Sequence, residues 1–152
     1  MSTLIIEKAK LKNLKDLIYL LFDDDLGKDR ENISETSFNN YKKSFMKILN
    51  DINNEIFIMV LNDQIIGMMQ LTFIPGLSME GMTRCQIESV RIKKDYRNKG
   101  YGSELMKKGI EIAKLNKCGL IQLTSNKKRL KAINFYQKLG FLSTHKSFKL
   151  DI

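Results

Sequence analysis

The sequence predicts a single domain of the α/β (α+β) class that spans residues 1–152. Three observations lead to this fold class. The length is that of one ordinary domain. Apolar runs of strand length alternate with segments whose apolar residues recur at helical spacing. No linker, internal repeat or low-complexity segment divides the chain. The expected order of elements is β-α-α-β-β-β-α-β-α-β.

The first third of the chain predicts one strand and two helices. Residues 3–9, TLIIEKA, have the length and the apolar content of a strand. In residues 13–22 apolar side chains recur at helical spacing after Asn13, a residue that favours the N-cap position. Residues 34–49 repeat this pattern after Ser34, so a second helix is expected directly after the first.

The middle of the chain predicts three strands. Two apolar runs within residues 55–73 are separated by Asn62 and Asp63, which both favour turns, and this pattern predicts a hairpin. The single proline, Pro75, marks a loop after the hairpin. A further strand is expected over residues 84–92, RCQIESVRI.

This last strand has an irregular apolar pattern. Side chains alternate between the two faces of a strand, and Ile87 has the opposite parity to Val90 and Ile92. A one-residue bulge near Glu88 and Ser89 would bring the three apolar side chains to one face. We therefore expect a β-bulge at this point.

The last third of the chain begins with its clearest amphipathic helix. From Gly102 onward, glutamates and lysines occupy one side of the helix and apolar residues the other. A strand over residues 119–125 and a short helix over residues 130–140, closed by Gly140, follow. A final strand or hairpin is expected over residues 141–150.

Composition excludes several classes of protein. No apolar run approaches the roughly 20 residues that span a bilayer, and the first residues lack the pattern of a signal peptide, so a cytoplasmic protein is expected. Cys85 and Cys118 form no C-x-x-C pair, which favours buried free thiols over a zinc site or a disulfide. His145 is the only histidine and no G-x-S-x-G serine occurs, so neither a metal site nor a hydrolase triad is expected.

The formal net charge of +9 is unevenly distributed. Residues 1–90 hold 10 Lys and Arg against 13 Asp and Glu, whereas residues 91–152 hold 16 against 4. Such asymmetry fits a polyanionic partner, either nucleic acid or a phosphorylated cofactor. It equally fits a general bias of this chain toward lysine, so charge alone does not decide between these interpretations.

A glycine-containing turn, RNKGYG at residues 97–102, joins the strand over residues 84–92 to the amphipathic helix. A turn of this kind places backbone N–H groups at the positive end of a helix dipole, where a phosphate can bind. Glycine avoids the Cβ that would obstruct this approach, and Arg97 and Lys99 add positive charge. Neither G-x-G-x-x-G nor G-x-x-x-x-G-K-[ST] is present, which argues against NAD and ATP.

The motif Arg97-x-x-Gly100-x-Gly102 resembles the acetyl-CoA loop, Q/R-x-x-G-x-G/A, of the GNAT superfamily of acetyl-CoA-dependent N-acetyltransferases. Residues 132–141, AINFYQKLGF, resemble the A-x-x-x-Y-x-K-x-G-F segment of the same family. The resemblance is good over residues 86–141, and the earlier part of the chain matches in element order only. It implies the fold of that family, a central, mixed and mostly antiparallel sheet flanked by helices.

The resemblance also implies acetyl-CoA as co-substrate and no metal. The strand over residues 84–92 would hold the pantetheine arm, and the glycine turn would hold the pyrophosphate. Many family members carry Asn seven residues before the matching Tyr136, where this chain has Arg129, with Asn126 three residues earlier. The expected acetyl-CoA-binding residues are Val90, Arg91, Ile92, Arg97, Asn98, Lys99, Gly100, Tyr101, Gly102, Ser103, Asn126, Arg129 and Ala132.

Three residues are candidates for the chemistry of acetyl transfer. The resemblance implies that the Val90 N–H polarises the thioester and that Tyr136 protonates the leaving thiolate. Glu88 is the carboxylate best placed beside the expected bulge to take a proton from the amine, directly or through water. Both side chains also have structural interpretations, because Glu88 could be a surface residue or a partner of Arg91, and Tyr136 a core aromatic.

The acceptor is expected to be a primary amine on a small molecule, acetylated by direct transfer in a ternary complex. The acidic run Asp23–Asp25 would favour a cationic acceptor, although such a run is also typical of a turn. The alternatives are acetylation of protein lysines or N-termini, a non-catalytic acyl-CoA sensor, and a nucleic-acid-binding module. No basic recognition helix or zinc spacing supports the last of these. The sequence leaves the identity of the amine and a homodimer open.

Overall fold

The computed structural model describes residues 3–24 and 27–152. The chain divides into two compact units, Met1–Gln122 and Leu123–Ile152, and each is described by itself. Two short 3-10 turns lie at Leu11–Asn13 and Lys94–Tyr96. The strands and helices are β1 (Leu4–Lys8), α1 (Leu14–Phe22), α2 (Glu35–Leu49), β2 (Asn54–Leu61), β3 (Gln64–Pro75), α3 (Ser78–Gly81), β4 (Thr83–Ile92), α4 (Tyr101–Leu115), β5 (Leu120–Leu123) and α5 (Leu130–Lys138).

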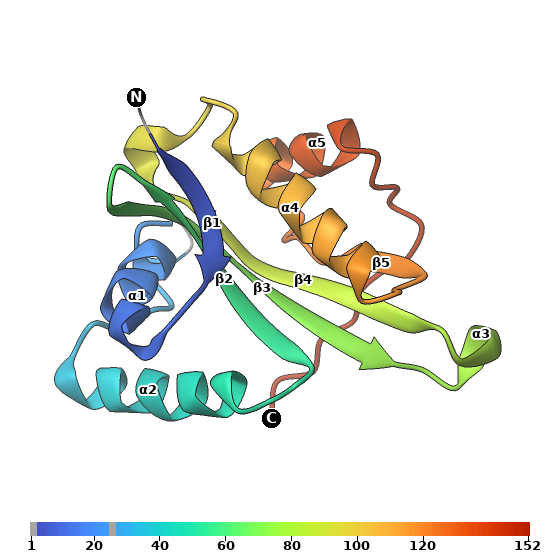
Figure 1. Cartoon of the computed structure of the whole chain (residues 1–152), viewed down its shortest axis with the longest axis horizontal. Helices are drawn as coiled ribbons and strands as arrows, with labels where there is room; N and C mark the ends of the chain where they lie inside the picture. The colour runs from blue at the N-terminus through green and yellow to red at the C-terminus, as the bar shows by residue number, and fades with distance from the viewer. Residues whose placement is uncertain (1–2, 25–26) are drawn as a thin grey trace. The chain divides into compact units, whose positions relative to one another are not determined.

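The five strands form one sheet in the order β1-β2-β3-β4-β5 (Figure 1). The pairs β1–β2, β2–β3 and β3–β4 are all antiparallel, so these four strands form a meander. The long connection through α4 separates β4 from β5 in the sequence. The predicted fold class is therefore confirmed, and the predicted order of elements holds from β1 to α5 except for the short α3, which was not expected between β3 and β4.

Helices cover both faces of this sheet (Figure 1). On one face, α1 and α2 pack on β2 and β3. On the other face, α4 packs on β3 and β4, with Gly109 of α4 lying against Met69 and Ile87. The buried residues of the first face are Ala9, Leu14, Leu17, Ile18, Leu20, Phe45, Ile56, Ile58 and Met68.

The β2–β3 hairpin has the turn that its sequence predicts. Asn62 and Asp63 both have positive φ, 48° and 63°, as the two central residues of a type I′ turn require. This turn matches the right-handed twist of the flanking strands. It fixes the register of the hairpin, in which Leu61 pairs with Gln64.

The caps of the two N-terminal helices differ from each other. The Ser34 hydroxyl accepts a hydrogen bond of 3.3 Å from the Ser37 N–H and caps α2 as predicted. Asn13 precedes α1, but its side chain instead accepts a hydrogen bond of 2.8 Å from the Lys10 N–H. Asn13 therefore stabilises the 3-10 turn before α1 and gives no side-chain cap to the helix itself.

The strand expected over residues 141–150 is not formed. Residues 141–152 contain no regular secondary structure, and their apolar side chains Leu142, Phe148 and Leu150 are more than four-fifths exposed. Alternating apolar residues favour an extended chain, but a strand is stable only when a neighbouring strand satisfies its backbone groups. Within residues 124–152 no other strand is present to do so.

The two cysteines lie in different environments. Cys85 on β4 is fully buried, and burial raises the pKa of its thiol to about 11. Cys118, which follows α4, is half-buried, so the expectation of buried free thiols holds fully only for Cys85. None of the helices in residues 3–24 and 27–152 is long and apolar enough to cross a bilayer.

Candidate functional site

The N-terminus of α4 presents backbone N–H groups at the predicted glycine turn. Gly100 is the N-cap of α4 and has a left-handed conformation, with φ 87° and ψ −14°. No side chain caps this helix, and the first N–H groups of an α-helix have no partner within the helix. The amides of Tyr101, Gly102 and Ser103 therefore lie where the helix dipole favours a bound anion.

The turn itself is held by aromatic and polar contacts. The Tyr96 and Tyr101 rings lie 6.1 Å apart between centroids, and the Tyr96 hydroxyl donates a hydrogen bond of 2.8 Å to Gln64. The Lys99 ammonium lies 5.7 Å from the centroid of the Tyr96 ring. Asn98 has a φ of 60°, so the chain reverses direction here before α4 begins. These contacts fix the position of the backbone amides.

Arg97 does not act as the free positive charge that the sequence suggests. Its Nε donates to the Ile92 carbonyl at 2.8 Å, and its Nη2 donates to the Asp23 carbonyl at 2.7 Å. The same nitrogen lies 3.7 Å from the Asp23 carboxylate. The guanidinium therefore connects the end of β4 to the end of α1, and these contacts hold the first residue of the glycine turn in place.

The bulge predicted in β4 is present. Glu88 pairs with Gln70 of β3, whereas Arg91 pairs with Met68. Between these pairs, two residues of β4 face one residue of β3. The first of the two, Ser89, has a φ of 52°, a left-handed conformation that breaks the regular ladder.

The bulge changes which face each β4 side chain occupies. Ile87 pairs with Leu71, and Ile92 pairs with Gly67, four residues from Leu71 on β3. Residues of β3 separated by an even number share one face, so Ile87 and Ile92 lie on the same face although their numbers differ in parity. The parity argument from the sequence is thereby confirmed.

The candidate catalytic groups of β4 flank this bulge. Glu88 is exposed and lies on the face of the sheet that α1 and α2 cover in part. Val90 is half-buried, and its carbonyl accepts a hydrogen bond of 2.9 Å from Arg91 Nη1. The Val90 N–H belongs to the irregular stretch, where a bulge disturbs the normal strand pairing.

Arg91 forms a buried ion pair that the sequence did not predict. Its Nη2 lies 3.6 Å from the Asp24 carboxylate, and the two side chains are 11% and 9% exposed. Asp23 pairs with Arg97, and it also accepts a hydrogen bond of 2.9 Å from the Lys94 N–H. The first two aspartates of the acidic run thus form ion pairs with Arg91 and Arg97, and Asp23 also accepts a hydrogen bond from the backbone.

These ion pairs change the interpretation of the acidic run. We expected Asp23–Asp25 to favour a cationic acceptor, but the charges of Asp23 and Asp24 are balanced by Arg97 and Arg91. Asp25 lies outside the described residues. No sequence pattern could have signalled these pairs, because their partners are more than 60 residues apart in the chain.

The remaining candidates belong to the second unit. Ala132 and Tyr136 lie on α5, and Arg129 is its N-cap residue. The Asn126 side chain accepts a hydrogen bond of 2.9 Å from the Lys128 N–H, and its carbonyl accepts one of the same length from the Arg129 N–H. The loop before α5 is therefore ordered by Asn126.

The Tyr136 ring contacts two other aromatic rings of its own unit. Its ring centroid lies 5.2 Å from that of Phe135 and 6.1 Å from that of Phe141, the latter in an edge arrangement. The side chain is half-buried. These contacts fix the direction of the phenol ring relative to α5 and agree with the predicted aromatic segment.

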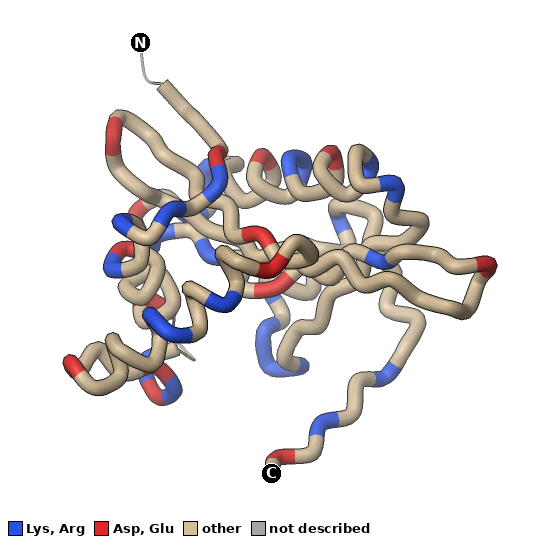
Figure 2. The backbone as a smooth tube through the Cα atoms, turned by 60° about the horizontal axis from the view of Figure 1, so that its bottom comes forward, with Lys and Arg blue, Asp and Glu red and all other residues tan. Residues whose placement is uncertain are grey.

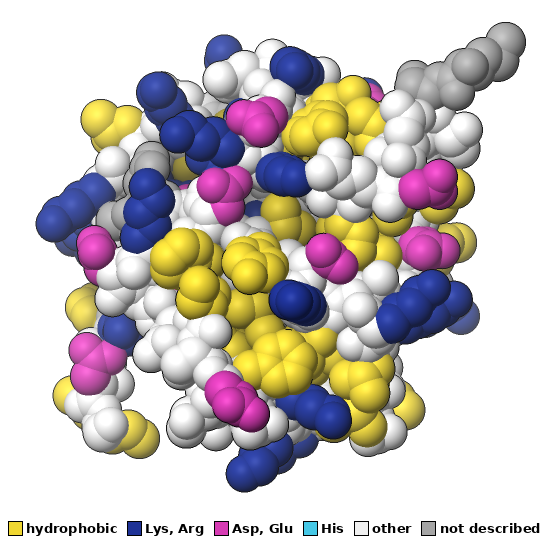
Figure 3. All heavy atoms as spheres, turned by 90° about the vertical axis from the view of Figure 1, so that its left-hand side faces the viewer, with side chains coloured by type: hydrophobic (Ala, Val, Ile, Leu, Met, Phe, Trp, Pro, Cys, Tyr) yellow, Lys and Arg dark blue, Asp and Glu magenta, His cyan; other side chains and the backbone are white. Residues whose placement is uncertain are grey.

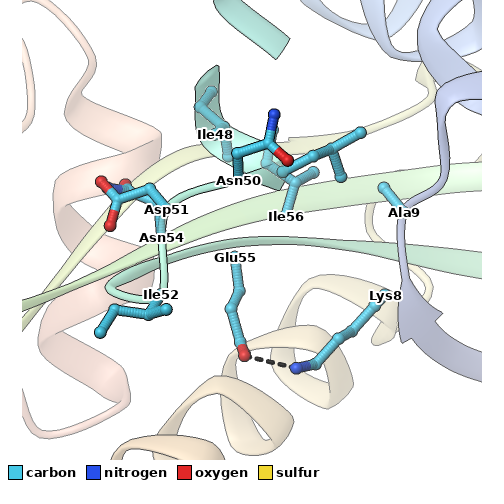
Figure 4. Close-up of a pocket in the computed structure, with 10 residues that line it drawn as sticks. Lys8, Ala9, Ile48, Asn50, Asp51, Ile52, Asn54, Glu55 and Ile56 are labelled. Carbon is cyan, nitrogen blue, oxygen red and sulfur yellow. Dashed lines mark hydrogen bonds and ion pairs between the residues drawn. The ribbon is translucent and has the colours of Figure 1, made fainter. Parts of the chain in front are cut away.

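Two hollows lie elsewhere on the first unit. A cavity of about 240 Å³ is formed where the end of α2 meets β1 and the start of β2, and the Lys8–Glu55 ion pair lies at its edge (Figure 4). A smaller hollow of about 60 Å³ lies between α1 and α2, on a side where apolar side chains reach the surface (Figure 3). Across residues 3–24 and 27–152, no group of three or more His, Cys, Asp or Glu could hold a metal ion.

Comparison with known proteins agrees with this geometry. The chain matches the model of the acetyltransferase (GNAT) family over residues 15–141. A glucosamine 6-phosphate N-acetyltransferase of Trypanosoma brucei brucei is 32% identical over 89 residues, which are 59% of this chain and 58% of that protein. The match thus spans little more than half the length of that relative.

Solved structures match over nearly the whole chain. A transcriptional regulator from Bacillus halodurans C-125 superposes with a TM-score of 0.94 at 37% identity, covering 99% of this chain and 100% of that one. A protein from Clostridium acetobutylicum, described as a predicted acetyltransferase and crystallised with acetyl-CoA, gives a TM-score of 0.77 at 19% identity, covering 98% and 96% of the two chains. At that lower identity the likeness shows the fold alone.

Proposed function

Because the chain belongs to the acetyltransferase (GNAT) family, we propose that it moves the acetyl group of acetyl-CoA to a primary amine of a small molecule, within one ternary complex. One observation supports this proposal most strongly. The bulged strand β4 is joined by the turn over residues 93–100 to the N-terminus of α4, which has no side-chain cap, and both elements lie in the same unit. A strand with disturbed pairing beside an anion-binding helix end suits a ligand with an amide-containing arm and a diphosphate.

The residues at this place fit acetyl-CoA. The amides of Tyr101, Gly102 and Ser103 would hold the pyrophosphate, and Gly100 leaves open space where a Cβ would otherwise stand. Residues 90–92 would hold the pantetheine arm through their backbone groups. When bound, acetyl-CoA supplies an acetyl group activated as a thioester.

The chain's own groups would then act on the two substrates. Glu88 would take a proton from the ammonium form of the acceptor, because an alkylamine with a pKa of about 10 is almost wholly protonated at neutral pH. The Val90 N–H would donate to the thioester oxygen as negative charge develops on it. Tyr136 would give its phenolic proton to the departing thiolate. These three roles are part of the proposal.

Gly100 offers a test of the pyrophosphate site. In Gly100→Ala the left-handed conformation, φ 87°, should lower the free energy of unfolding by about 1–2 kcal/mol, and the new methyl group should weaken acetyl-CoA binding about tenfold. Gly140→Ala is a matched control, because Gly140 has a φ of 92° and similarly open surroundings. Chemical denaturation should show the same loss for both variants, and calorimetric titration should show weaker binding only for Gly100→Ala. Equal binding by both would contradict the assignment.

Tyr136 offers a test of the proton donor. In Tyr136→Phe the ring contacts with Phe135 and Phe141 are kept while the hydroxyl is lost. We expect kcat to fall about 100-fold, at the lower end for proton transfer because a thiolate is a good leaving group, with the KM for acetyl-CoA unchanged. Tyr19→Phe, an exposed position on α1, is the control. An unaltered kcat would leave Tyr136 as a packing residue.

The proposed function as a whole is tested by thiol release from acetyl-CoA with a panel of primary amines and lysine-containing peptides. Transfer to one of the small amines is the expected result. Preferential transfer to peptides would favour a protein acetyltransferase. If acetyl-CoA stabilises the protein, by about 2.7 kcal/mol at 100 times its dissociation constant, while no amine is acetylated, the chain is an acyl-CoA sensor and the proposed reaction is wrong.

A second candidate function is nucleic-acid binding, since a relative at 37% identity is described as a transcriptional regulator. The most regular basic element argues against it. On α4, Lys107 pairs with Glu104 at 2.8 Å and Lys108 approaches Glu111 at 3.4 Å, so this helix carries both signs of charge (Figure 2). Stabilisation by duplex DNA that weakens steeply with salt would support the second candidate over the first.

A further inference from the structure

A line of uncharged polar side chains crosses the sheet beside Glu88. Strand pairing places Asn54 of β2 opposite Thr72 of β3, and Thr72 opposite Gln86 of β4. One pair further along, Gln70 lies opposite Glu88. We call the following residues the polar row: Asn54, Gln70, Thr72, Gln86 and Gln122.

The polar row lies on the face of the sheet that carries α1 and α2. Gln70 pairs with Ile56, which is buried in the hydrophobic core under these two helices. Directly opposite residues of neighbouring strands share a face, so the row continues the same face beyond that core. All five side chains are half-buried, which means that they are neither covered by the core nor fully in solvent.

Hydrogen bonds hold the row in one arrangement. Asn54 Oδ1 accepts from the Thr72 hydroxyl at 2.7 Å and from Gln70 Nε2 at 3.3 Å. Asn54 Nδ2 donates to the Asp51 carboxylate at 2.7 Å, which fixes the orientation of the amide. Hydrogen bonds from the Asn53 N–H and the Asn54 side chain lower the pKa of Asp51, so this anchor stays ionised at neutral pH.

The other half of the row is held in the same way. Gln122 Nε2 donates to Gln86 Oε1 at 2.8 Å, and this bond joins β5 to β4. Within the part of the chain that the structure describes, the row keeps further capacity: Thr72 Oγ1, Gln70 Oε1 and Gln122 Oε1 can accept, and Gln86 Nε2 can donate.

The charged side chains around the polar row limit the kinds of acceptor molecule that it can bind. Two carboxylates neighbour it, Glu88 and Asp51, and Asp51 already accepts hydrogen bonds from the Asn53 N–H and from Asn54 Nδ2. Asp23 and Asp24 are balanced by arginines. Arg84 lies two residues before Gln86, on the same face of β4, so a cation lies at the end of the row that is far from Glu88. A polycation would gain little from this surface, whereas neutral donors and acceptors match hydroxyl or amide groups.

We propose that the acceptor is a hydroxylated primary amine, of the amino alcohol or amino sugar class, whose hydroxyl groups bind Gln70, Thr72 and Gln86 while its amine faces Glu88. This inference rests on the proposed acetyl transfer and adds the class of acceptor to it. The row residues act as specificity-determining residues that position the acceptor, and the proton transfer stays with Glu88.

The test compares acceptors that differ in their hydroxyl groups. The probes are glucosamine, an aminocyclohexanol, cyclohexylamine and spermidine, each assayed for kcat/KM at saturating acetyl-CoA. We expect the aminocyclohexanol to exceed cyclohexylamine at least about tenfold, because the two amines have similar shape and basicity and unpaired polar groups of the site penalise the analogue without a hydroxyl.

Variants show whether the row is responsible for this preference. Thr72→Val and Gln70→Leu should each lower kcat/KM for the hydroxylated amines about three- to tenfold and leave the value for cyclohexylamine unchanged. Thr36→Val, at an exposed position on α2, makes the same chemical change away from the row and should alter neither value. A loss of stability alone would affect both amines equally, so the ratio of the two separates recognition from folding.

The outcomes distinguish the two proposals from each other. If cyclohexylamine or spermidine is acetylated as well as the hydroxylated amines, the inference about the acceptor is wrong and acetyl transfer stands. If the preference exists but survives both row substitutions, the row is not its cause and the inference is again wrong. If acetyl-CoA binds and none of the amines is acetylated, the proposed function fails and the inference fails with it.

Discussion

In Glu88→Gln, kcat should fall by about 10²–10⁴-fold, because a positioned base contributes this much to proton transfer and the amide cannot accept the proton. Glu88 is exposed on β4 beside the bulge, so the amide should fit without altering the core. Affinity for acetyl-CoA should be unchanged, since the proposed contacts of the cofactor lie on the backbone of β4 and α4. Steady-state kinetics together with calorimetric titration would measure both quantities.

Glu7→Gln is the matched control for this variant. Glu7 is also an exposed glutamate on a strand, but it lies on β1 at the edge of the sheet, with β2 and β3 between it and β4. Its substitution should leave kcat as in the wild type. Were Glu88→Gln to retain full activity as well, Glu88 would be a surface residue, and the base would have to be water or another side chain.

In Asp24→Asn, the free energy of unfolding should decrease by about 3–5 kcal/mol. Asp24 and Arg91 form an ion pair in which both side chains are about nine-tenths buried, and removing one charge leaves the other in a poorly solvated place. Urea denaturation followed by circular dichroism would measure the loss. The effect should exceed that of most surface substitutions, which change stability by about 0.5 kcal/mol or less.

The neighbouring residue provides the control for this prediction. Asp23 pairs with Arg97 at a similar distance, 3.7 Å, but these side chains are 37% and 32% exposed. Water screens such a pair, so Asp23→Asn should cost about 1 kcal/mol or less. The combined Asp24→Leu and Arg91→Met variant should recover much of the stability, because it removes both buried charges. Equal losses for Asp23→Asn and Asp24→Asn would show that burial does not set the strength of these pairs.

The two ion pairs connect the end of α1 to β4 and to the turn before α4. Asp23 is the C-cap residue of α1, which covers one face of the sheet, and Asp24 follows it. Arg97 begins the turn that leads to α4 on the other face. Substitutions at the end of α1 should therefore also affect the turn over residues 97–102. The same contacts explain why Asp23 and Asp24 are not available to an incoming cation.

The sequence by itself determined the features that depend on a few neighbouring residues. The pair Asn62 and Asp63 favours a type I′ turn through its own backbone preferences, and Gly100 allows the left-handed N-cap of α4. The bulge could also be predicted, because the parity of Ile87 and Ile92 conflicts within one short strand. In each case the physical cause lies within ten residues of the chain.

Only the tertiary structure decided which distant groups meet. Arg97 contacts Asp23 across a separation of 74 residues, and Gln122 bonds to Gln86 across 36. No local pattern specifies such partners, because they follow from the register of the strands and the path of the chain. The segment over residues 141–150 shows the same limit, since its alternating pattern favours extension while a strand also needs a partner. The motifs of a binding site could thus be found in the sequence, and the side chains that would select its acceptor became visible only in the assembled sheet.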